Sequence, residues 1–371
     1  MSDKTKIQWC DSTVNPIMGC AGCELFPAPS IILNQLDHEG MRQSSLWHEG
    51  IAEEVLLRLF EHAPTPTDKM TTTNIYHTRH ALCDYLSNGC FGEIDCRPLL
   101  RIIESAVSCY ASRLHLNKAT SIGNPERKAN PGYAPTFEEI TQYRGRMGKT
   151  ATLADLSGRI DNESPWKNGL ARMIFVSDMG DAFSHQSDFA FLKEEAISAI
   201  QSNAGQRHLW LWLTKRPRTM GRFANEIGGF PKNVCAMTTL TCADQANLRR
   251  LDQIREVAAD CRGLSIEPLR ERIPVGRLDL SGIDWVIVGG ESGAIRNVNP
   301  FNMEWAIELK EHCHANGVAF FMKQLGRAPH WKGLPIKLRN THGGNWAEWP
   351  SEAKLKVREF PAYFHSYPAG K

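Results

Sequence analysis

HLWLWLT, residues 208–214, is an apolar run that ends on a hydroxyl residue and is followed by Lys215 and Arg216. Apolar runs without polar alternation are typical of strands buried on both faces of a parallel sheet. Five further runs of this kind occur: Met173–Val176, VCAMTT from 234, GLSIEP from 263, DWVIVGG from 284 and VAFFMK from 318. Amphipathic, helix-like stretches lie between several of them, namely DFAFLKEEAISAIQSN, ADQANLRRLDQIREVAADC and NMEWAIELKEHCHANG. This alternation predicts consecutive β/α units.

A further apolar stretch near the start of the chain, KIQWC at 6–10, is a predicted first strand. Strands and helices in this rhythm favour an α/β fold in the form of a complete or partial TIM-like (β/α) barrel. A doubly wound open sheet is the competing architecture. The periodicity is compatible with both.

The segment 28–105 interrupts the β/α rhythm with helix-like stretches that prolines at 64, 66 and 98 separate or begin. We therefore expect a β/α domain formed by 1–27 plus 106–371, with 28–105 as a helical insertion. Residues 120–168 are expected to form a long loop with a short helix. The tail from 329 is expected to wrap around the surface of the barrel.

Composition narrows the class of protein without naming a function. Of the 371 residues 42% are hydrophobic and 23% charged, which is typical of a globular protein. The chain has no apolar run long enough for a transmembrane helix, and MSDKTKIQWCDST lacks the apolar core of a secretory signal, so we expect a cytoplasmic protein without a membrane partner. In a reducing compartment its 11 cysteines are thiols, metal ligands or catalytic groups. The net charge of +2 permits a nucleic-acid partner without indicating one.

Acids, bases and hydroxyls follow six of the predicted strands. They are Ser177, Asp178 and Asp181; Thr214, Lys215 and Arg216; Thr238, Thr239 and Thr241; Glu267; Gly289, Gly290, Glu291 and Ser292; and Lys323 and Gln324. A polar strand end is also typical of any solvated loop, so no single residue decides. Their recurrence on six strands predicts a site at the carboxyl ends of the barrel strands.

Two cysteines, Cys20 and Cys23, lie in the loop NPIMGCAGCELFP after the predicted first strand. A structural zinc site would need two more ligands, and Cys90 and Cys96 do not have the spacing of a zinc knuckle. A redox pair would be expected at the start of a helix in a thioredoxin-like unit. An iron–sulfur cluster is the third option. Spacing alone leaves the three open.

TVNPIMGCAGCELFP resembles the cluster loop of a phage- and prophage-associated family of radical-SAM-like proteins with a three-cysteine motif. In that family a third cysteine lies in a CYA…LH segment, which SCYASRLHL at 108–116 matches through Cys109. The segments FVSDMGDAF, LTKRP, LSIEPL, DWVIVGGESG, FFMKQLG and WAEWP…VREFP are also similar and occur in the same order. The resemblance covers about 1–27 and 106–361 and does not account for the insertion.

The resemblance implies a radical-SAM-type barrel with a [4Fe-4S] cluster held by Cys20, Cys23 and Cys109. It also implies S-adenosyl-L-methionine as the second cofactor, an external electron donor, and a carbon radical that acts on an unknown substrate. Cys10 is then a bystander, and Cys83, Cys90 and Cys96 are core thiols of the insertion. Radical-SAM proteins often bind the amino group of the cofactor with a GGE-like motif after the second strand. Here GGE, residues 289–291, lies on a late strand, so the resemblance assigns this contact to SDMGD, residues 177–181.

By this assignment each cofactor contact has a chemical reason. A carboxylate suits the cofactor ammonium, and Lys215 with Arg216 suits the cofactor carboxylate or a substrate phosphate. Two glycines allow the backbone to approach a ligand closely. The predicted cofactor-binding residues are Ser177, Asp178, Asp181, Lys215, Thr239, Glu267, Gly289, Gly290 and Glu291.

Two further functions compete with a radical enzyme of unspecified substrate. In the first, the substrate is a nucleic-acid base or nucleotide, and TKRPRTMGR and PLRERIPVGR contact phosphates. In the second, the chain is a non-enzymatic iron–sulfur or zinc-bearing module of a phage or defence complex, and the insertion docks a partner protein. Reductive cleavage of S-adenosylmethionine separates enzyme from module.

Overall fold

The computed structural model describes residues 4–20, 109–111, 114–115, 130, 132–134, 137, 140–184, 188–293 and 298–367. The predicted insertion 28–105 lies outside the described residues, and Cys23, Cys83, Cys90 and Cys96 lie outside them as well. The chain divides into two compact units, one formed by Met1–Pro16 with Tyr143–Lys371 and the other by Ile17–Gln142. Each unit is described by itself.

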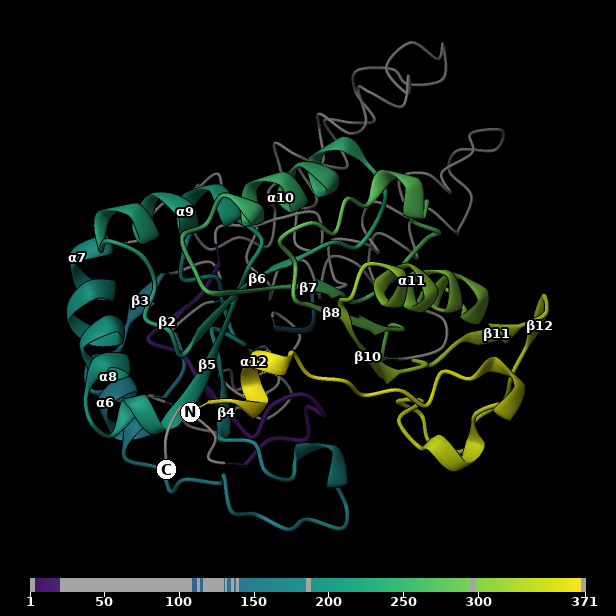
Figure 1. Ribbon diagram of the computed structural model, residues 1–371, viewed down its shortest axis with the longest axis horizontal. Helices are drawn as coiled ribbons and strands as arrows, with labels where there is room; N and C mark the ends of the chain where they lie inside the picture. The colour runs from purple at the N-terminus through teal and green to yellow at the C-terminus, as the bar shows by residue number, and fades with distance from the viewer. Residues whose placement is uncertain are drawn as a thin grey trace, which may run out of the picture. The chain divides into compact units, whose positions relative to one another are not determined.

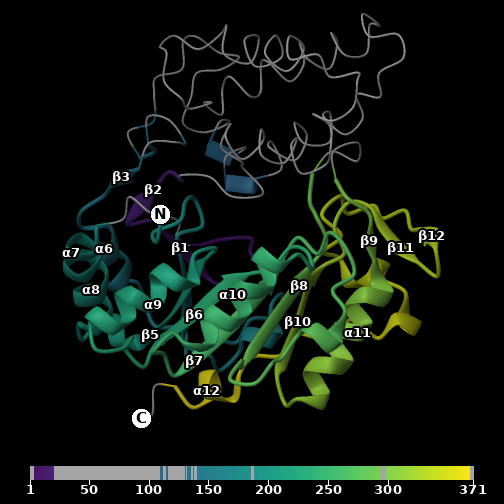
Figure 2. The same ribbon diagram turned by 90° about the horizontal axis from the view of Figure 1, so that it is seen from above.

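The larger unit is built on a curled sheet of seven parallel strands, which forms a half-barrel (Figures 1 and 2). The strands occur in the order β1-β4-β5-β6-β7-β8-β10, so neighbours in the sheet follow one another along the chain. Their bounds are Ser12–Val14 (β1), Arg172–Val176 (β4), His208–Thr214 (β5), Val234–Thr239 (β6), Cys261–Ile266 (β7), Trp285–Gly289 (β8) and Ala319–Gln324 (β10). The α/β fold with a partial barrel-like sheet is confirmed at this level.

The apolar runs from 173 to 324 correspond to β4, β5, β6, β7, β8 and β10, as predicted. The predicted first strand at 6–10 is wrong, because the strand that pairs with β4 is β1, Ser12–Val14. Its Ser and Thr side chains are buried, so it carries no apolar run by which to recognise it. Trp9 and Cys10, which gave the earlier stretch its apolar character, pack in the core instead.

Helices pack against one face of the sheet. They are α6 (Arg146–Ala151), α7 (Phe189–Leu192), α8 (Ser198–Gln201), α9 (Pro217–Glu226), α10 (Gln245–Arg255) and α11 (Met303–Ala315). A π-helical turn at Lys193–Ile197 joins α7 to α8, so the predicted helix at 188–203 is one continuous helical stretch. Short 3-10 turns lie at Pro165–Lys167, Gly205–Arg207, Val275–Arg277, Trp346–Glu348 and Ser351–Ala353. No helix in this described part of the chain has the length and apolar character needed to cross a membrane.

The opposite, concave face carries an apolar cluster of its own. Because successive side chains of a strand point to opposite faces of the sheet, every second residue of each strand lies on this face. The cluster includes Phe175 of β4, Met237 of β6 and Trp285 of β8, and Trp9 packs on Phe175 with ring centroids 4.7 Å apart. These side chains form an apolar floor inside the half-barrel.

The C-terminal segment runs along the half-barrel, but it is not confined to the surface. Its first two strands, β11 (Pro329–Trp331) and β12 (Leu334–Pro335), form a small sheet with β9 (Phe301–Asn302), which precedes α11, in the order β12-β11-β9. It then passes antiparallel to β10, where Met322 N donates to Val357 O and Glu359 N donates to Phe320 O. Finally Phe360 and Phe364 of the α12 region (Ala362–His365) enter the apolar cluster against Trp285.

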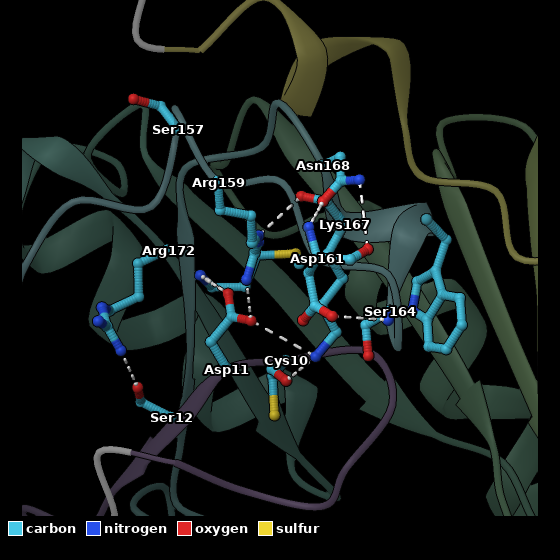
Figure 3. A network of polar contacts seen from close by, with 12 residues as sticks. Cys10, Asp11, Ser12, Ser157, Arg159, Asp161, Ser164, Lys167, Asn168 and Arg172 are labelled. Atoms are coloured by element: carbon cyan, nitrogen blue, oxygen red, sulfur yellow. Dashed lines mark hydrogen bonds and ion pairs between the residues drawn. The ribbon is translucent and has the colours of Figure 1, made fainter.

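A polar network at the amino ends of β1 and β4 fixes the start of the chain (Figure 3). Arg159 Nη1 lies 2.5 Å from Asp11 Oδ1, and Lys167 Nζ donates to Cys10 O at 2.5 Å. Asp11 Oδ2 accepts from Met173 N, and Arg172 donates to Ser12 Oγ across the strand pair. The amino ends of barrel strands are the stability face of such folds, and these buried, hydrogen-bonded charges fit that role.

The smaller unit is described only at its two ends and in short pieces between them. β2 (Ile17–Met18) pairs antiparallel with β3 (Thr141–Gln142). Tyr110, Ala111, Leu114 and His115 are helical and directly follow Cys109.

Candidate functional site

The carboxyl ends of the parallel strands carry polar side chains on the concave face, above the apolar floor. Side chains two residues apart on a strand lie on the same face of the sheet. Ser177, Thr239 and Gly289 each come two residues after a residue of the apolar floor, namely Phe175, Met237 and Ile287, so they lie on the concave face as well. The same alternation brings Glu267 and Lys323 to this face. Four of the predicted site residues, Ser177, Thr239, Glu267 and Gly289, therefore lie on one surface.

Glu267 and Lys323 form an ion pair across the end of β8. Lys323 Nζ donates to Glu267 Oε1, and the two side chains are only 16% and 17% exposed. Gly289 lies between them: a Cβ there would stand 3.3 Å from Glu267 Cγ and 3.4 Å from its Cδ. Gly289 was predicted to allow close approach of a ligand. In the structure the group that approaches it closely is the Glu267 side chain.

Ser177 occupies an unusual position directly after β4. Its φ of 72° lies in the left-handed region, which costs free energy for a residue with a side chain. The side chain is buried, and its Oγ has no hydrogen-bond partner in the described part of the chain. Backbone strain together with an orphaned buried hydroxyl is typical of a position kept for a ligand.

Asp178 is held by Asn15, which follows β1. Asn15 Nδ2 donates to Asp178 Oδ1 at 2.6 Å, and Asn15 Oδ1 accepts from Met179 N at 2.9 Å. Burial raises the pKa of the Asp178 carboxyl above its ordinary value, although the hydrogen bond from Asn15 acts in the opposite direction. Asn15 is the asparagine of the NP dipeptide that precedes the Cys20 loop, and sequence patterns alone do not reveal this contact. Its function is to clamp the loop that follows β4.

Asp181, which follows β4, accepts hydrogen bonds from the residues at the end of β5 and directly after it. Its Oδ1 accepts from Thr214 Oγ1 at 2.7 Å and from Phe183 N at 3.0 Å, while its Oδ2 accepts from Lys215 N at 3.0 Å and Arg216 Nη1 at 2.9 Å. Four protein donors occupy both of its oxygens. The arrangement fixes the backbone that carries Lys215, and a cofactor contact by Asp181 stays a prediction.

The end of β6 is tied to α10 through backbone groups. Arg250 Nη1 donates to Thr239 O at 3.1 Å, and Thr241 N donates to Asn247 Oδ1 at 3.0 Å. Thr239 is 4% exposed. Its parity places its side chain on the concave face, as the predicted contact to a ribose requires.

Gly290 and Glu291 lie against the turn after β10. A Cβ on Gly290 would stand 2.2 Å from Leu325 O, so only glycine fits there, for a reason internal to the fold. Glu291 is buried, and its Oε2 accepts from Asn299 Nδ2 at 2.8 Å and lies 4.0 Å from Arg270 Nε. Within the residues described, its Oε1 has no hydrogen-bond partner. A buried carboxylate with one unpaired oxygen can accept a donor from a ligand.

Two of the three predicted cluster cysteines are described, and both belong to the smaller unit. Cys20 is buried, and its N donates to Phe137 O at 2.8 Å. The Phe137 ring lies 5.7 Å from the His115 ring, and His115 Nε2 hydrogen bonds to Ala134 O at 2.8 Å. Burial lowers the pKa of His115, which favours its neutral form. His115 belongs to the CYASRLH segment, so this chain of contacts joins the Cys20 loop to the segment that begins at Cys109.

The donor set fits an iron–sulfur cluster in its chemistry. Cys20 and Cys109 supply thiols from segments that pack together, and the third predicted ligand, Cys23, lies outside the described residues. Among the residues that the structure describes, no group of three or more His, Cys, Asp or Glu side chains is arranged to hold a metal ion. Cys10, the predicted bystander, lies in the apolar cluster of the larger unit, and burial raises the pKa of its thiol well above the ordinary value.

Comparison with known proteins gives one family. A family described as "Protein of unknown function (DUF5131)" matches residues 83–350, a range that includes Cys109 and all strands from β4 to β10 but neither Cys20 nor Cys23. No curated protein and no solved structure matches the chain. Because the match spans more than half of its length, the chain belongs to the DUF5131 family.

Proposed function

We propose that this protein is a radical S-adenosylmethionine enzyme whose [4Fe-4S] cluster is held by Cys20, Cys23 and Cys109. The observation that carries the proposal is the packing of the Cys20 loop on the CYASRLH segment through Phe137 and His115. Segments 89 residues apart in sequence (109 − 20) come together with a thiol on each. A parallel half-barrel with polar residues at its carboxyl edge supports the same assignment.

When bound, the cluster and S-adenosylmethionine would supply a carbon radical. Ser177 offers a hydroxyl that has no partner among the described residues, and Asp178 offers a carboxyl group; these are the group types that suit an ammonium ligand. Asn15 orients the Asp178 carboxylate, and Asp181 fixes the backbone beneath Lys215. The apolar floor of Phe175, Trp285 and Phe321 excludes water from below. We place the protein in the cytoplasm, where such thiols stay reduced.

Anaerobic reconstitution with iron and sulfide tests this function. We expect one four-iron cluster per chain, a change in its electron paramagnetic resonance signal on addition of S-adenosylmethionine, and release of 5′-deoxyadenosine under reducing conditions. Cys20→Ser and Cys109→Ser should each lose most of the iron. Cys242→Ser is the matched control, because Cys242 is also partly exposed and its Sγ donates to Asp244 Oδ2, a bond that a hydroxyl keeps.

Retention of full iron content by Cys109→Ser would contradict the ligand assignment. Zinc bound in place of iron, or a cluster that never cleaves S-adenosylmethionine, would instead favour a non-enzymatic module.

A further inference from the structure

The ion pair between Glu267 and Lys323 is assembled from three strands of the larger unit. Glu267 follows β7, Lys323 belongs to β10, and β8 lies between those strands in the sheet. The pair therefore bridges over the last residue of β8, Gly289. Both side chains are more than four-fifths buried, yet neither is sealed off from solvent.

Lys323 sits on a bulge in β10. Met322 pairs with Val288 and Gln324 with Gly289, so Lys323 is an extra residue without a partner on β8. Bulges occur next to active sites, where they re-aim a side chain. Arg358 donates to the carbonyls of Met322 and Lys323 at 3.5 and 3.3 Å, which holds the bulge in place. Arg358 thus maintains a local irregularity at the residue whose ammonium pairs with Glu267.

The groups around the pair favour an anion as its ligand. In the described part of the chain the Lys323 ammonium hydrogen bonds only to Glu267, so its remaining N–H donors are available. Glu267 lies against the backbone at Gly289, which limits its movement, whereas lysine is a flexible point charge suited to oxyanions. The concave face adds hydroxyls at Ser177 and Thr239 as further hydrogen-bond donors.

We propose that Lys323 binds an oxyanion, a phosphate or carboxylate group, on the molecule that enters the half-barrel. Glu267 and the β10 bulge are positioning elements that keep the ammonium aimed at the concave face until the ligand arrives. The proposal concerns a binding site of the larger unit and does not depend on the cysteines or on radical chemistry.

The test uses the full chain, without reconstitution, and two probes: inorganic phosphate and acetate. Apparent affinities are obtained from the rise in thermal unfolding temperature with probe concentration, at constant ionic strength set by sodium chloride. Phosphate and acetate compared side by side distinguish a phosphoryl from a carboxylate ligand. The variants are Lys323→Met, Glu267→Gln and, as the matched control, Lys337→Met, which removes an exposed lysine near β12.

Lys323→Met should weaken binding of the preferred anion about tenfold or more, because a charge-assisted hydrogen bond is lost. Glu267→Gln should tighten it about two- to fivefold, because the anion no longer competes with the carboxylate. Lys337→Met should bind like the unaltered protein.

A purely structural ion pair gives a different pattern. In that case both substitutions lower the unfolding temperature without changing its dependence on either anion, and the proposal is overturned. Should Lys323→Met fail to fold, Glu267→Gln decides alone: tighter binding supports the site, and unchanged or weaker binding overturns it. Because no cluster is involved, loss of the radical chemistry alone leaves this result unaffected.

Discussion

Asp178 shows how a single residue at the candidate site lowers the stability of the fold. The residue is half-buried, and the partial burial raises the pKa of its carboxyl above the ordinary value. A carboxyl whose pKa is higher in the folded than in the unfolded state contributes stability while it is protonated at acid pH. That contribution is lost as the pH rises through the folded-state pKa. The fold therefore disfavours the charged form of this carboxyl, which is typical of functional positions.

Asp178→Asn should raise the free energy of unfolding at pH 7 by on the order of 1 kcal/mol. The amide keeps an oxygen for the hydrogen bond from Asn15 but carries no charge. The gain should shrink as the pH is lowered from 7 to about 3, because protonation removes the charge that burial disfavours. Urea denaturation at both pH values measures the difference. The control is Glu226→Gln, an exposed carboxylate at the end of α9, and a gain of equal size at both pH values would refute the argument.

At the scale of elements, one arginine of the C-terminal segment holds that segment against β10, the last strand of the sheet. The Arg358 guanidinium lies 3.9 Å from the centre of the Trp166 ring and 4.5 Å from that of Trp346. It also donates to the carbonyls at the β10 bulge. Burial lowers its pKa to about 10, so it remains charged at neutral pH. A planar, stacked cation is what this position requires.

Arg358→Lys should therefore be nearly as damaging as Arg358→Ala. We expect losses of about 2 kcal/mol for lysine and about 3 kcal/mol for alanine, because the stacking and the paired hydrogen bonds disappear in both. Urea denaturation measures these values. If Arg358→Lys were as stable as the unaltered protein, a positive charge alone would suffice at this position, and the stacking argument would be wrong.

The strands from β4 to β10 could be predicted from the sequence because strands buried on both faces consist of continuous apolar residues, as HLWLWLT does for β5. β1 left no such signal, since Ser12 and Thr13 are buried through backbone pairing and polar contacts. The polar strand ends were predicted as a group, and alternation places Ser177, Thr239 and Glu267 on one face. The bulge at Lys323 and the Asn15 clamp depend on register and on partners distant in sequence, which periodicity does not encode.

On the scale of the larger unit, aromatic residues of the C-terminal segment complete the apolar floor. Phe364 is fully buried, and its ring lies 5.5 Å from that of Trp285, while Phe360 lies 5.3 Å from the same ring. Trp285 Nε1 also donates to Glu359 O at 3.0 Å. The sheet and the segment that follows it thus share one core.

Phe364→Ala should destabilise the protein by about 3 kcal/mol and increase binding of the dye 8-anilinonaphthalene-1-sulfonate, because it opens the floor. Tyr367→Phe is the control; it removes only the hydroxyl that donates to Gln206 O at 2.6 Å and should cost less than about 1 kcal/mol. Equal effects of the two substitutions would show that the segment covers the floor without supporting it.

The pairing of β1 with β4 has a consequence for the newly made chain. Ser12 pairs with Ile174, so the ribosome must add about 160 residues before the first strand meets its neighbour, a wait on the order of ten seconds at usual rates of synthesis. During that interval Asp11 lacks Arg159, Lys167 and the Met173 amide. Trp9 lacks the Phe175 ring throughout the same period. The first strand therefore stays unpaired while the whole smaller unit is synthesised, and its pair with β4 is the first pair of the seven-stranded sheet that the growing chain can complete.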